Sequence, residues 1–182
     1  MAFFGDFFHL STFWRSLNST FLVLIPKKGC TKELKDFRPI SLVGSLYKLF
    51  AKVLANRLKQ VVGEVVSEYQ YAFIQNTQIL DVALIANKAV DSRLKVNIPG
   101  LLLKLDIEKA FDHVNWDCLI LVMSKIGFGQ KWINWISWCI STANFSILIN
   151  RTPSDFFCTS RGLRQRDPLS PSLFLLFMEV LS

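Results

Sequence analysis

The sequence has few charged residues and lacks a hydrophobic run long enough to cross a membrane. Charged residues make up 19% of the 182 residues, and hydrophobic residues make up 51%. This balance excludes a disordered chain and favours a piece of a large core. No segment reaches about 18 consecutive apolar residues, and the longest uncharged stretch, residues 132–150, is interrupted by Asn, Ser and Thr. We therefore expect a buried core, with a membrane-associated hydrophobic protein as an alternative from another class.

The sequence also lacks the cysteine and histidine spacing of a zinc site. Its four cysteines (Cys30, Cys118, Cys139 and Cys158) contain no Cys-x-x-Cys pair, and neither His9 nor His113 lies near one of them in metal-ligand spacing. This pattern predicts free thiols in a reducing compartment and no zinc. The N-terminus has no basic stretch and is a poor signal peptide. We expect an intracellular protein, in the cytoplasm or the nucleus.

Positive charge is concentrated in one part of the chain. Residues 27–59 hold nine Lys or Arg and two acids, whereas the remainder holds twelve basic and twelve acidic residues, so this segment carries the whole net charge of +7. A basic region in an otherwise neutral chain suggests a polyanion as partner. A solvated helix face remains the alternative explanation.

The apolar run after Pro99-Gly100 predicts a buried strand over residues 101–106, which ends in the carboxylate Asp106. A rigid strand end fixes the position of such a carboxylate, so Asp106 is a candidate metal ligand. A strand that ends in Asp and a turn is also common in α/β proteins. The later acids Glu108 and Asp112 are better explained as surface or turn residues.

A basic hairpin is predicted near the N-terminus. Residues 20–26 read as a strand stopped by Pro26, residues 27–30 as a turn, and residues 36–41 as the return. Lys27 and Arg38 are candidate contacts for phosphate oxygens, because Arg offers a two-pronged donor set. Ordinary surface cations are the alternative.

Four helices are predicted from apolar periodicity: residues 45–62, 79–94, 116–126 and 130–142. The first should end at Gly63, and the third should begin at an Asn115 cap and end at Gly127. The tryptophans of the fourth helix predict that this helix belongs to the core. The apolar side of the first helix is expected to comprise Leu46, Leu49, Phe50, Val53, Leu54, Leu58, Val61 and Val62. That of the second should include Ile79, Val82, Ala83, Ala86, Ala89, Val90 and Leu94.

The C-terminal third predicts a hairpin and a polar loop. Residues 144–149 and 156–160 read as its two strands, with residues 150–153 as the turn. A type I′ turn needs φ > 0 at both central residues, which suits Arg151 poorly. The loop 161–171 then enters a helix over residues 172–181, with Pro171 well placed at its start.

Four stretches together resemble the reverse transcriptases of LINE-type (non-LTR) retrotransposons, of a plant-like kind. They are Asn18-Ser-Thr-Phe through Lys27 with Asp36-Phe-Arg-Pro-Ile-Ser41, then Gln70–Asp81, then Lys104-Leu-Asp-Ile-Glu-Lys-Ala-Phe-Asp-His-Val-Asn-Trp116, and then Gly162-Leu-Arg-Gln-Arg-Asp-Pro-Leu-Ser-Pro171. They cover nearly the whole chain in the family's order.

The resemblance implies an α+β fold, the fingers (about 18–98) and a partial palm (about 99–182) of a right-hand polymerase. It implies that Asp106 is catalytic and holds Mg²⁺. It also implies that Phe111 blocks a ribose 2′-OH, and that Gln165, Arg38 and Lys27 contact nucleotide or template. The implied partners are an RNA template, a DNA primer and dNTP, without a membrane. Helices 45–62 and 116–126 should pack on the sheet containing strand 101–106, with Asp106 near Gln165.

The chain departs from the family pattern at several places. Asn76 and Thr77 replace a Gly-Arg pair, and Arg151 and Arg166 stand where the family has glycine. The Ala-Asp-Asp hairpin, which supplies two of the family's three active-site carboxylates, is not within these residues. We therefore expect a truncated domain without catalytic activity. A residual, non-specific RNA-binding module is the alternative function.

Overall fold

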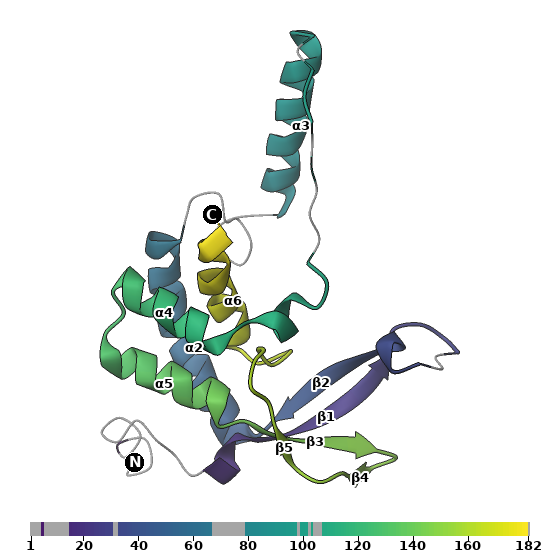
Figure 1. Ribbon diagram of the computed structural model, residues 1–182, viewed down its shortest axis with the longest axis vertical. Coiled ribbons are helices and arrows are strands. Elements are labelled where there is room, and N and C mark those ends of the chain that lie inside the picture. The colour runs from purple at the N-terminus through teal and green to yellow at the C-terminus, as the bar shows by residue number, and fades with distance from the viewer. Residues whose placement is uncertain are drawn as a thin grey trace.

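The structure is a computed structural model of the chain, and it describes residues 5, 15–30, 33–66, 79–97, 99–101, 103 and 107–181. Its elements, in chain order, are η1 (Arg15–Asn18), β1 (Ser19–Pro26), η2 (Leu34–Asp36), β2 (Phe37–Val43), α2 (Ser45–Val65), α3 (Ile79–Lys95), η3 (Ala110–His113), α4 (Trp116–Ile126), α5 (Gln130–Ser141), β3 (Asn144–Ile149), β4 (Thr152–Pro153), β5 (Phe157–Cys158), α6 (Ser170–Met178) and η4 (Glu179–Leu181). Strands and helices occupy separate regions (Figure 1), which confirms the predicted α+β class.

Within the described residues, five strands form one mixed sheet in the order β2-β1-β3-β4, with β5 also paired to β3. β1 and β2 are antiparallel and pair from Thr20↔Val43 to Pro26↔Phe37, which confirms the predicted hairpin. β1 also pairs in parallel with β3, so residues more than a hundred positions apart lie side by side. Figure 1 shows β1 and β2 extending together away from the helices.

The β3–β4 turn is tighter than predicted. Ile149 already pairs with Thr152, so the turn consists of Asn150 and Arg151 alone. Both have positive φ, 51° and 68°, as a type I′ turn requires. The predicted strand 156–160 shortens to β5, because Ser154 bonds to Ile147 through both its backbone N–H and its hydroxyl and interrupts the ladder.

The core lies among α2, α4, α5 and α6. α4 packs against α5 and α6, and α2 packs against α6. The predicted start of α4 is confirmed, because Asn115 Oδ1 accepts from Cys118 N at 2.9 Å, and so is its end at Gly127 with φ 99°. Trp135 and Trp138 are buried in this core, as expected. α6 starts at Ser170, two residues before the predicted start.

The predicted apolar side of α2 is half wrong. Phe50, Leu54, Leu58 and Val62 are buried, but Leu46, Leu49, Val53 and Val61 are each at least 40% exposed. The buried side is completed by Tyr47, Ala51 and Ala55. Alanine lets a neighbouring helix approach closely, so α2 is rotated toward its small residues and leaves part of its aliphatic stripe uncovered.

α2 also runs past the predicted stop at Gly63 and ends at Val65. A glycine inside a helix costs only about 1 kcal/mol. The burial of Val62 and Val66 on either side of it offsets that cost.

The predicted strand 101–106 is not present where the structure describes it. Leu101 and Leu103 are 92% and 69% exposed and belong to no strand, and residues 104–106 lie outside the described residues. A strand that is apolar on both faces needs neighbouring strands and cover on both sides. Most of residues 101–106 lie outside the described residues, so the packing of α2 and α4 on that strand stays a prediction; among the described residues, α4 packs against α5 and α6, and α2 packs against α6.

α3 forms over the predicted residues, but the described members of its predicted apolar side are not buried. Every side chain that the structure describes on it is exposed, and Figure 1 shows the helix standing apart from the core. An apolar stripe predicts a helix from local periodicity alone, whereas burial requires a partner. None of the helices in the described part of the chain combines the length and apolarity needed to cross a membrane.

Candidate functional site

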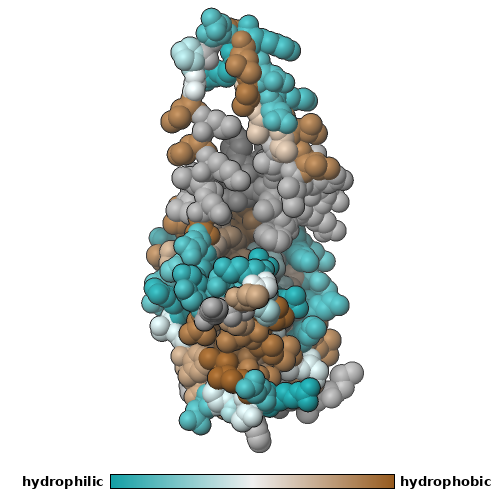
Figure 2. Space-filling model, turned by 90° about the vertical axis from the view of Figure 1, so that its right-hand side faces the viewer, coloured by the Kyte–Doolittle hydropathy of each residue, from teal (hydrophilic) through white to brown (hydrophobic). Residues whose placement is uncertain are grey.

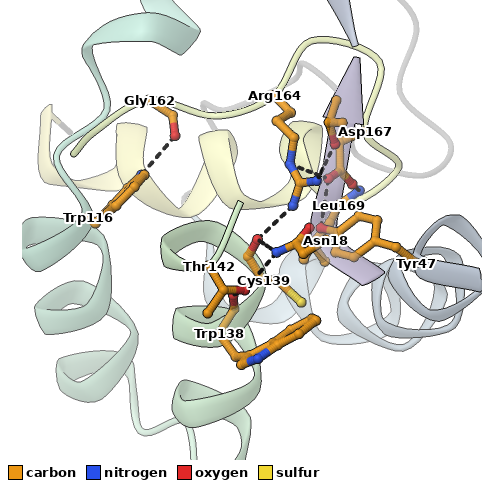
Figure 3. A network of polar contacts seen from close by, with 11 residues as sticks. Asn18, Tyr47, Trp116, Trp138, Cys139, Thr142, Gly162, Arg164, Asp167 and Leu169 are labelled. Atoms are coloured by element: carbon orange, nitrogen blue, oxygen red, sulfur yellow. Dashed lines mark hydrogen bonds and ion pairs between the residues drawn. The ribbon is translucent and has the colours of Figure 1, made fainter. Parts of the chain in front are cut away.

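The loop from Arg161 to Leu169 joins β5 to α6 and is held by a buried ion pair. Arg164 Nε lies 3.4 Å from Asp167 Oδ2, and these side chains are only 6% and 4% exposed. Figure 3 shows both pointing inward from the loop toward β1, α2 and α5. Charged groups are buried only when paired and hydrogen-bonded, so these contacts fix the path of the loop.

Arg164 uses its remaining donors on two other elements. Its Nη1 donates to Thr20 Oγ1 of β1 at 3.2 Å, and its Nη2 donates to the Cys139 carbonyl of α5 at 2.7 Å. Its guanidinium also lies over the Tyr47 ring of α2, 4.2 Å from the centroid. One side chain therefore ties the loop to β1, α2 and α5.

The Asp167 carboxylate is also filled by protein donors. Its Oδ1 accepts from Leu169 N at 2.9 Å, and its Oδ2 accepts from the Tyr47 hydroxyl at 2.8 Å as well as facing Arg164. The bond to the backbone two residues on is an Asx turn, which leads into α6. Asp167 is therefore a structural acid and not an open ligand.

Asn18 extends this network to the start of β1. Its Nδ2 donates to the Cys139 carbonyl at 3.1 Å and to Thr142 Oγ1 at 2.8 Å. Its buried Oδ1 has no hydrogen-bond partner among the described residues. The Cys139 carbonyl thus accepts from both Asn18 and Arg164, one bond for each of its lone pairs.

Burial keeps the titratable groups beside the ion pair neutral. It is the main cause that raises the pKa of Tyr47 well above its usual range, and the nearby Cys139 and Asp167 raise it further. Burial likewise raises the pKa of the Cys139 thiol, and Asp167 adds to this shift. Tyr47 therefore remains a hydrogen-bond donor to Asp167 throughout the physiological range.

A cavity of about 480 Å³ lies beside the loop. It is bordered by Pro39 and Ser41 of β2, by Asp112, and by Gln165, which is half-buried. The structure therefore brings Gln165 to the wall of a cavity that the sheet and the segment around Asp112 complete.

Arg166 has φ 68°, the left-handed conformation that glycine adopts most easily. The family pattern has a glycine at this position. Its side chain is exposed, and none of the described contacts includes it. The backbone at this position thus adopts a conformation that favours glycine although the residue is arginine.

The segment around Phe111 is bonded to the loop. Leu163 N donates to the Phe111 carbonyl at 2.8 Å, and Gly162 N donates to the Val114 carbonyl at 2.8 Å. The Phe111 ring stacks on Phe174 of α6 with centroids 4.8 Å apart. The structure therefore places the segment of Phe111 next to the loop of Gln165, with the ring half-buried against α6.

Gly162 makes this approach possible. A Cβ at Gly162, whose φ is 89°, would lie 3.1 Å from the Asp112 carbonyl oxygen. Trp116 Nε1 donates to the Gly162 carbonyl at 2.8 Å, so the glycine is held on its other side as well (Figure 3).

Lys27 and Arg38 lie away from this loop, on the β1–β2 hairpin. Lys27 Nζ donates to the Lys35 carbonyl at 2.9 Å, and the neighbouring Lys28 pairs with Asp36 at 3.0 Å. Arg38 is exposed. Side chains alternate along a strand, so Arg38 points to the face opposite Pro39 and Ser41, which border the cavity.

A second group of cations lies on α2. Lys48, Lys52 and Lys59 are exposed, follow one another along one side of the helix, and have no ion-pair partner among the described residues. With the hairpin they account for much of the positive charge of residues 27–59.

The structure does not bring together the residues of a metal site where it describes the chain. Among the described residues, no three His, Cys, Asp or Glu lie close enough to hold an ion. Asp106 lies outside the described residues, as do Asn76 and Thr77. Glu108 and Asp112 are exposed. The described residues alone therefore do not fit a magnesium ion.

Sequence reasoning missed the central member of the network, Arg164. Asn18, Thr20 and Asp167 belong to the stretches that resemble the family pattern, whereas Tyr47 belongs to none of them. The one available signal was that Arg164 follows the apolar Leu163 and precedes an acid by three residues. That spacing permits an ion pair but does not show that it is buried.

Figure 2 shows apolar side chains gathered on one face of the molecule, framed by polar ones. The exposed aromatic residues include Phe21 of β1, Phe157 of β5 and its neighbour Phe156.

Comparison with known proteins gives consistent matches. The profile of the family described as "Reverse transcriptase (RNA-dependent DNA polymerase)" matches residues 25–182. The "Transposon TX1 uncharacterized 149 kDa protein" of Xenopus laevis is 32% identical over 87% of this chain and 12% of its own length. A "Retrovirus-related Pol polyprotein from type-1 retrotransposable element R2" of Popillia japonica is 29% identical over 91% of this chain and 23% of its own.

The "RNA-directed DNA polymerase from mobile element jockey" of Drosophila funebris is 24% identical over 96% of this chain and 19% of its own length. The chain thus spans between 12% and 23% of the length of these three relatives. The alternative of a membrane-associated protein finds no support in these comparisons.

Proposed function

This chain belongs to the reverse transcriptase family, and from that premise we propose that it forms the template-holding part of an RNA-directed DNA polymerase of a non-LTR retrotransposon. The observation that carries the proposal is the loop Arg161–Leu169, held by the Arg164–Asp167 pair so that Gln165 lies at the wall of a cavity. The ligands in this proposal are an RNA template, a DNA primer and a dNTP.

Three groups of residues have separate roles in this proposal. Gln165 lies against the templating base pair, where its amide can both donate and accept hydrogen bonds. Phe111 excludes a ribose 2′-OH, and its stacking on Phe174 keeps the ring from rotating away. Lys27, Arg38 and the α2 lysines bind backbone phosphates, which gives affinity without sequence preference.

The family generally uses a divalent metal ion, and for this chain we propose Mg²⁺ at Asp106. The ion would stabilise negative charge that develops on the reacting phosphate oxygens. Since the described residues do not complete such a site, no catalytic step is assigned to them. Their part is to bind and orient the nucleic acid.

The proposal is tested by RNA binding measured as fluorescence anisotropy with a labelled single-stranded RNA at several salt concentrations. The affinity should fall steeply as the salt concentration rises. The slope of log K against log salt concentration should be about −0.7 for each phosphate contacted. The triple variant Lys27→Ala, Lys28→Ala, Arg38→Ala should flatten that slope by about 1.4, since the two proposed contacts of Lys27 and Arg38 are removed and Lys28 is paired with Asp36.

A matched control separates position from total charge. Lys88, Lys95 and Lys125 are also exposed but lie outside residues 27–59. Changing these three to Ala removes the same charge and should leave the slope nearly unchanged. Equal losses in the two triple variants would refute the proposed surface.

A residual RNA-binding module without a polymerase role is the second candidate, and the lysine row on α2 favours it. Lys48, Lys52 and Lys59 are all unpaired among the described residues, and they would bind RNA whether or not Gln165 acts. Under that alternative, a labelled RNA annealed to a DNA primer binds no differently from single-stranded RNA, and Gln165→Ala changes neither affinity.

A further inference from the structure

Arg164 differs from the other cations of the chain in having no surface to offer a ligand. Its side chain is 6% exposed, and all three of its nitrogens have protein partners on Asp167, Thr20 and Cys139. A guanidinium in this state cannot also bind a phosphate. Its role must therefore be exerted through the residues it holds.

The residues that Arg164 holds set the position of Gln165. Arg164 and Asp167 are three residues apart and both point inward, so the two residues between them, Gln165 and Arg166, form the tip of a turn. The positive φ of Arg166 closes that turn. When both members of the pair are removed, the bonds of the Asp167 side chain to Tyr47 and Leu169 are lost with it, and the remaining backbone bonds of Gly162, Leu163 and Ser170 hold only the two ends of the loop.

The anchor points of the turn come from distant parts of the chain. Thr20 lies on β1 and accepts from Arg164. Tyr47 on α2 and Cys139 on α5 contact Asp167 and Arg164 (Figure 3). The turn therefore moves with the junction of these three elements. The basic hairpin is reached through the same strand, because β1 carries Thr20 at one end and leads to Lys27 at the other.

We propose that Arg164 is a positioning residue, which together with Asp167 locks the loop Arg161–Leu169 onto β1, α2 and α5 so that Gln165 can contact the nucleic acid. This inference rests on the proposed function for the role of Gln165. It goes further, because it makes the contact between Gln165 and the nucleic acid depend on a buried ion pair that does not itself touch the ligand.

A purely structural ion pair would behave differently. Replacing a buried pair by apolar residues of similar size is often neutral for stability. In that case Gln165 would act equally well with or without the pair. In our proposal the contribution of Gln165 disappears together with the pair, even in a chain that remains folded.

The test is a double-mutant cycle, with a fluorescein-labelled RNA template annealed to a DNA primer as the probe. The pair is removed by the combined change Arg164→Met, Asp167→Leu. In the unmodified chain, Gln165→Ala should weaken binding about tenfold, the value of one hydrogen bond to a well-placed group. In the pair-replaced chain the same change should weaken it less than about twofold.

An equal effect of Gln165→Ala in both backgrounds would overturn the proposal. The hairpin variant Lys27→Ala, Arg38→Ala is the internal control, because it should weaken binding by the same factor with and without the pair. A reduced effect of the hairpin variant would mean that the pair supports the whole fold, which also overturns a specific positioning role.

Limited trypsin digestion tests the same lock without any nucleic acid. Arg161 and Arg166 are exposed on the loop, and Lys125 is exposed on α4. Removal of the pair should speed cleavage after Arg161 and Arg166 at least about tenfold while cleavage after Lys125 keeps its rate. Unchanged cleavage at the loop, or a parallel increase at Lys125, would overturn the proposal.

A milder variant covers the case in which the pair-replaced chain does not fold. Tyr47→Phe removes one hydrogen bond from Asp167 but keeps the ring under Arg164. It should increase cleavage after Arg161 in the same direction by a smaller factor, and no increase would count against the lock. If Gln165→Ala has no effect in the unmodified chain, the proposed function of Gln165 is refuted, whereas the trypsin result still decides the role of Arg164.

Discussion

Replacing Arg166 or Arg151 by glycine should stabilise the fold. Both arginines have φ 68°, in the left-handed region. There the Cβ of any residue other than glycine meets the carbonyl oxygen, at a cost of about 1–2 kcal/mol. Glycine removes this strain, but its greater conformational freedom in the unfolded chain destabilises the folded state by about 0.5–1 kcal/mol.

The net gain is therefore about 0.5–1 kcal/mol at each position. For a chain of this size, 1 kcal/mol shifts Tm by about 2–4 °C, so each change should raise Tm by about 1–4 °C. The two turns lie in different loops, and their effects should add. Circular dichroism melts and urea unfolding at constant m-value measure both quantities.

Arg161 provides the matched control for this experiment. It is an exposed arginine of the same loop as Arg166 and is not among the described residues with positive φ. Arg161→Gly removes the same side chain and should lower stability by about 0.5–1 kcal/mol, because only the entropic cost remains. If Arg166→Gly lowers Tm as Arg161→Gly does, the reasoning from φ is wrong.

Three further predictions concern the site and its chemistry. Gly162→Ala should destabilise the chain by at least about 1–3 kcal/mol in urea unfolding, because its Cβ would press on the Asp112 carbonyl oxygen in a strained conformation; a neutral result would mean that the loop moves freely. Burial keeps the Cys139 thiol protonated above pH 9.0 in the folded chain, whereas in the unfolded chain the thiol has its ordinary pKa of 9.0. The free energy of unfolding should therefore fall as pH rises above 9.0, and this pH dependence should be weaker in Cys139→Ala. The 182-residue polypeptide on its own should not extend a DNA primer on an RNA template with Mg²⁺ or Mn²⁺, and Arg166→Gly should not change this; template-dependent incorporation that Asp106→Ala abolishes would contradict the prediction.

The local elements of the fold were predictable because their signals are local. Alternating apolar residues and Pro26 define β1, and Asn115 and Gly127 define both ends of α4. The choice of which residues of α2 are buried was only half correct. That choice depends on neighbours from α6 and from the loop: the alanines of α2 allow close approach, and the Tyr47 hydroxyl beside them bonds to Asp167.

The candidate site was predictable in part for the same reason. The position of Arg166 needs the conformation of glycine, as its φ shows, and this was visible as a departure from the family pattern. The buried role of Arg164 was not visible, because its partners lie up to 144 residues away in sequence. A contact of that kind has no local pattern, and the assignment of Asp106 stays a prediction.

The parallel pairing of β1 with β3 has a consequence for how the chain acquires its fold. The β1–β2 hairpin is complete once Val43 has been synthesised, but the other edge of β1 stays unpaired until Leu148 follows. At ordinary rates of translation this interval lasts roughly 5–20 s. During that time an apolar strand exposes its hydrogen-bonding groups, which makes it a ready partner for another nascent chain. Co-translational chaperone binding near residues 19–26 would protect this edge, and slowing synthesis between residues 43 and 144 should increase aggregation.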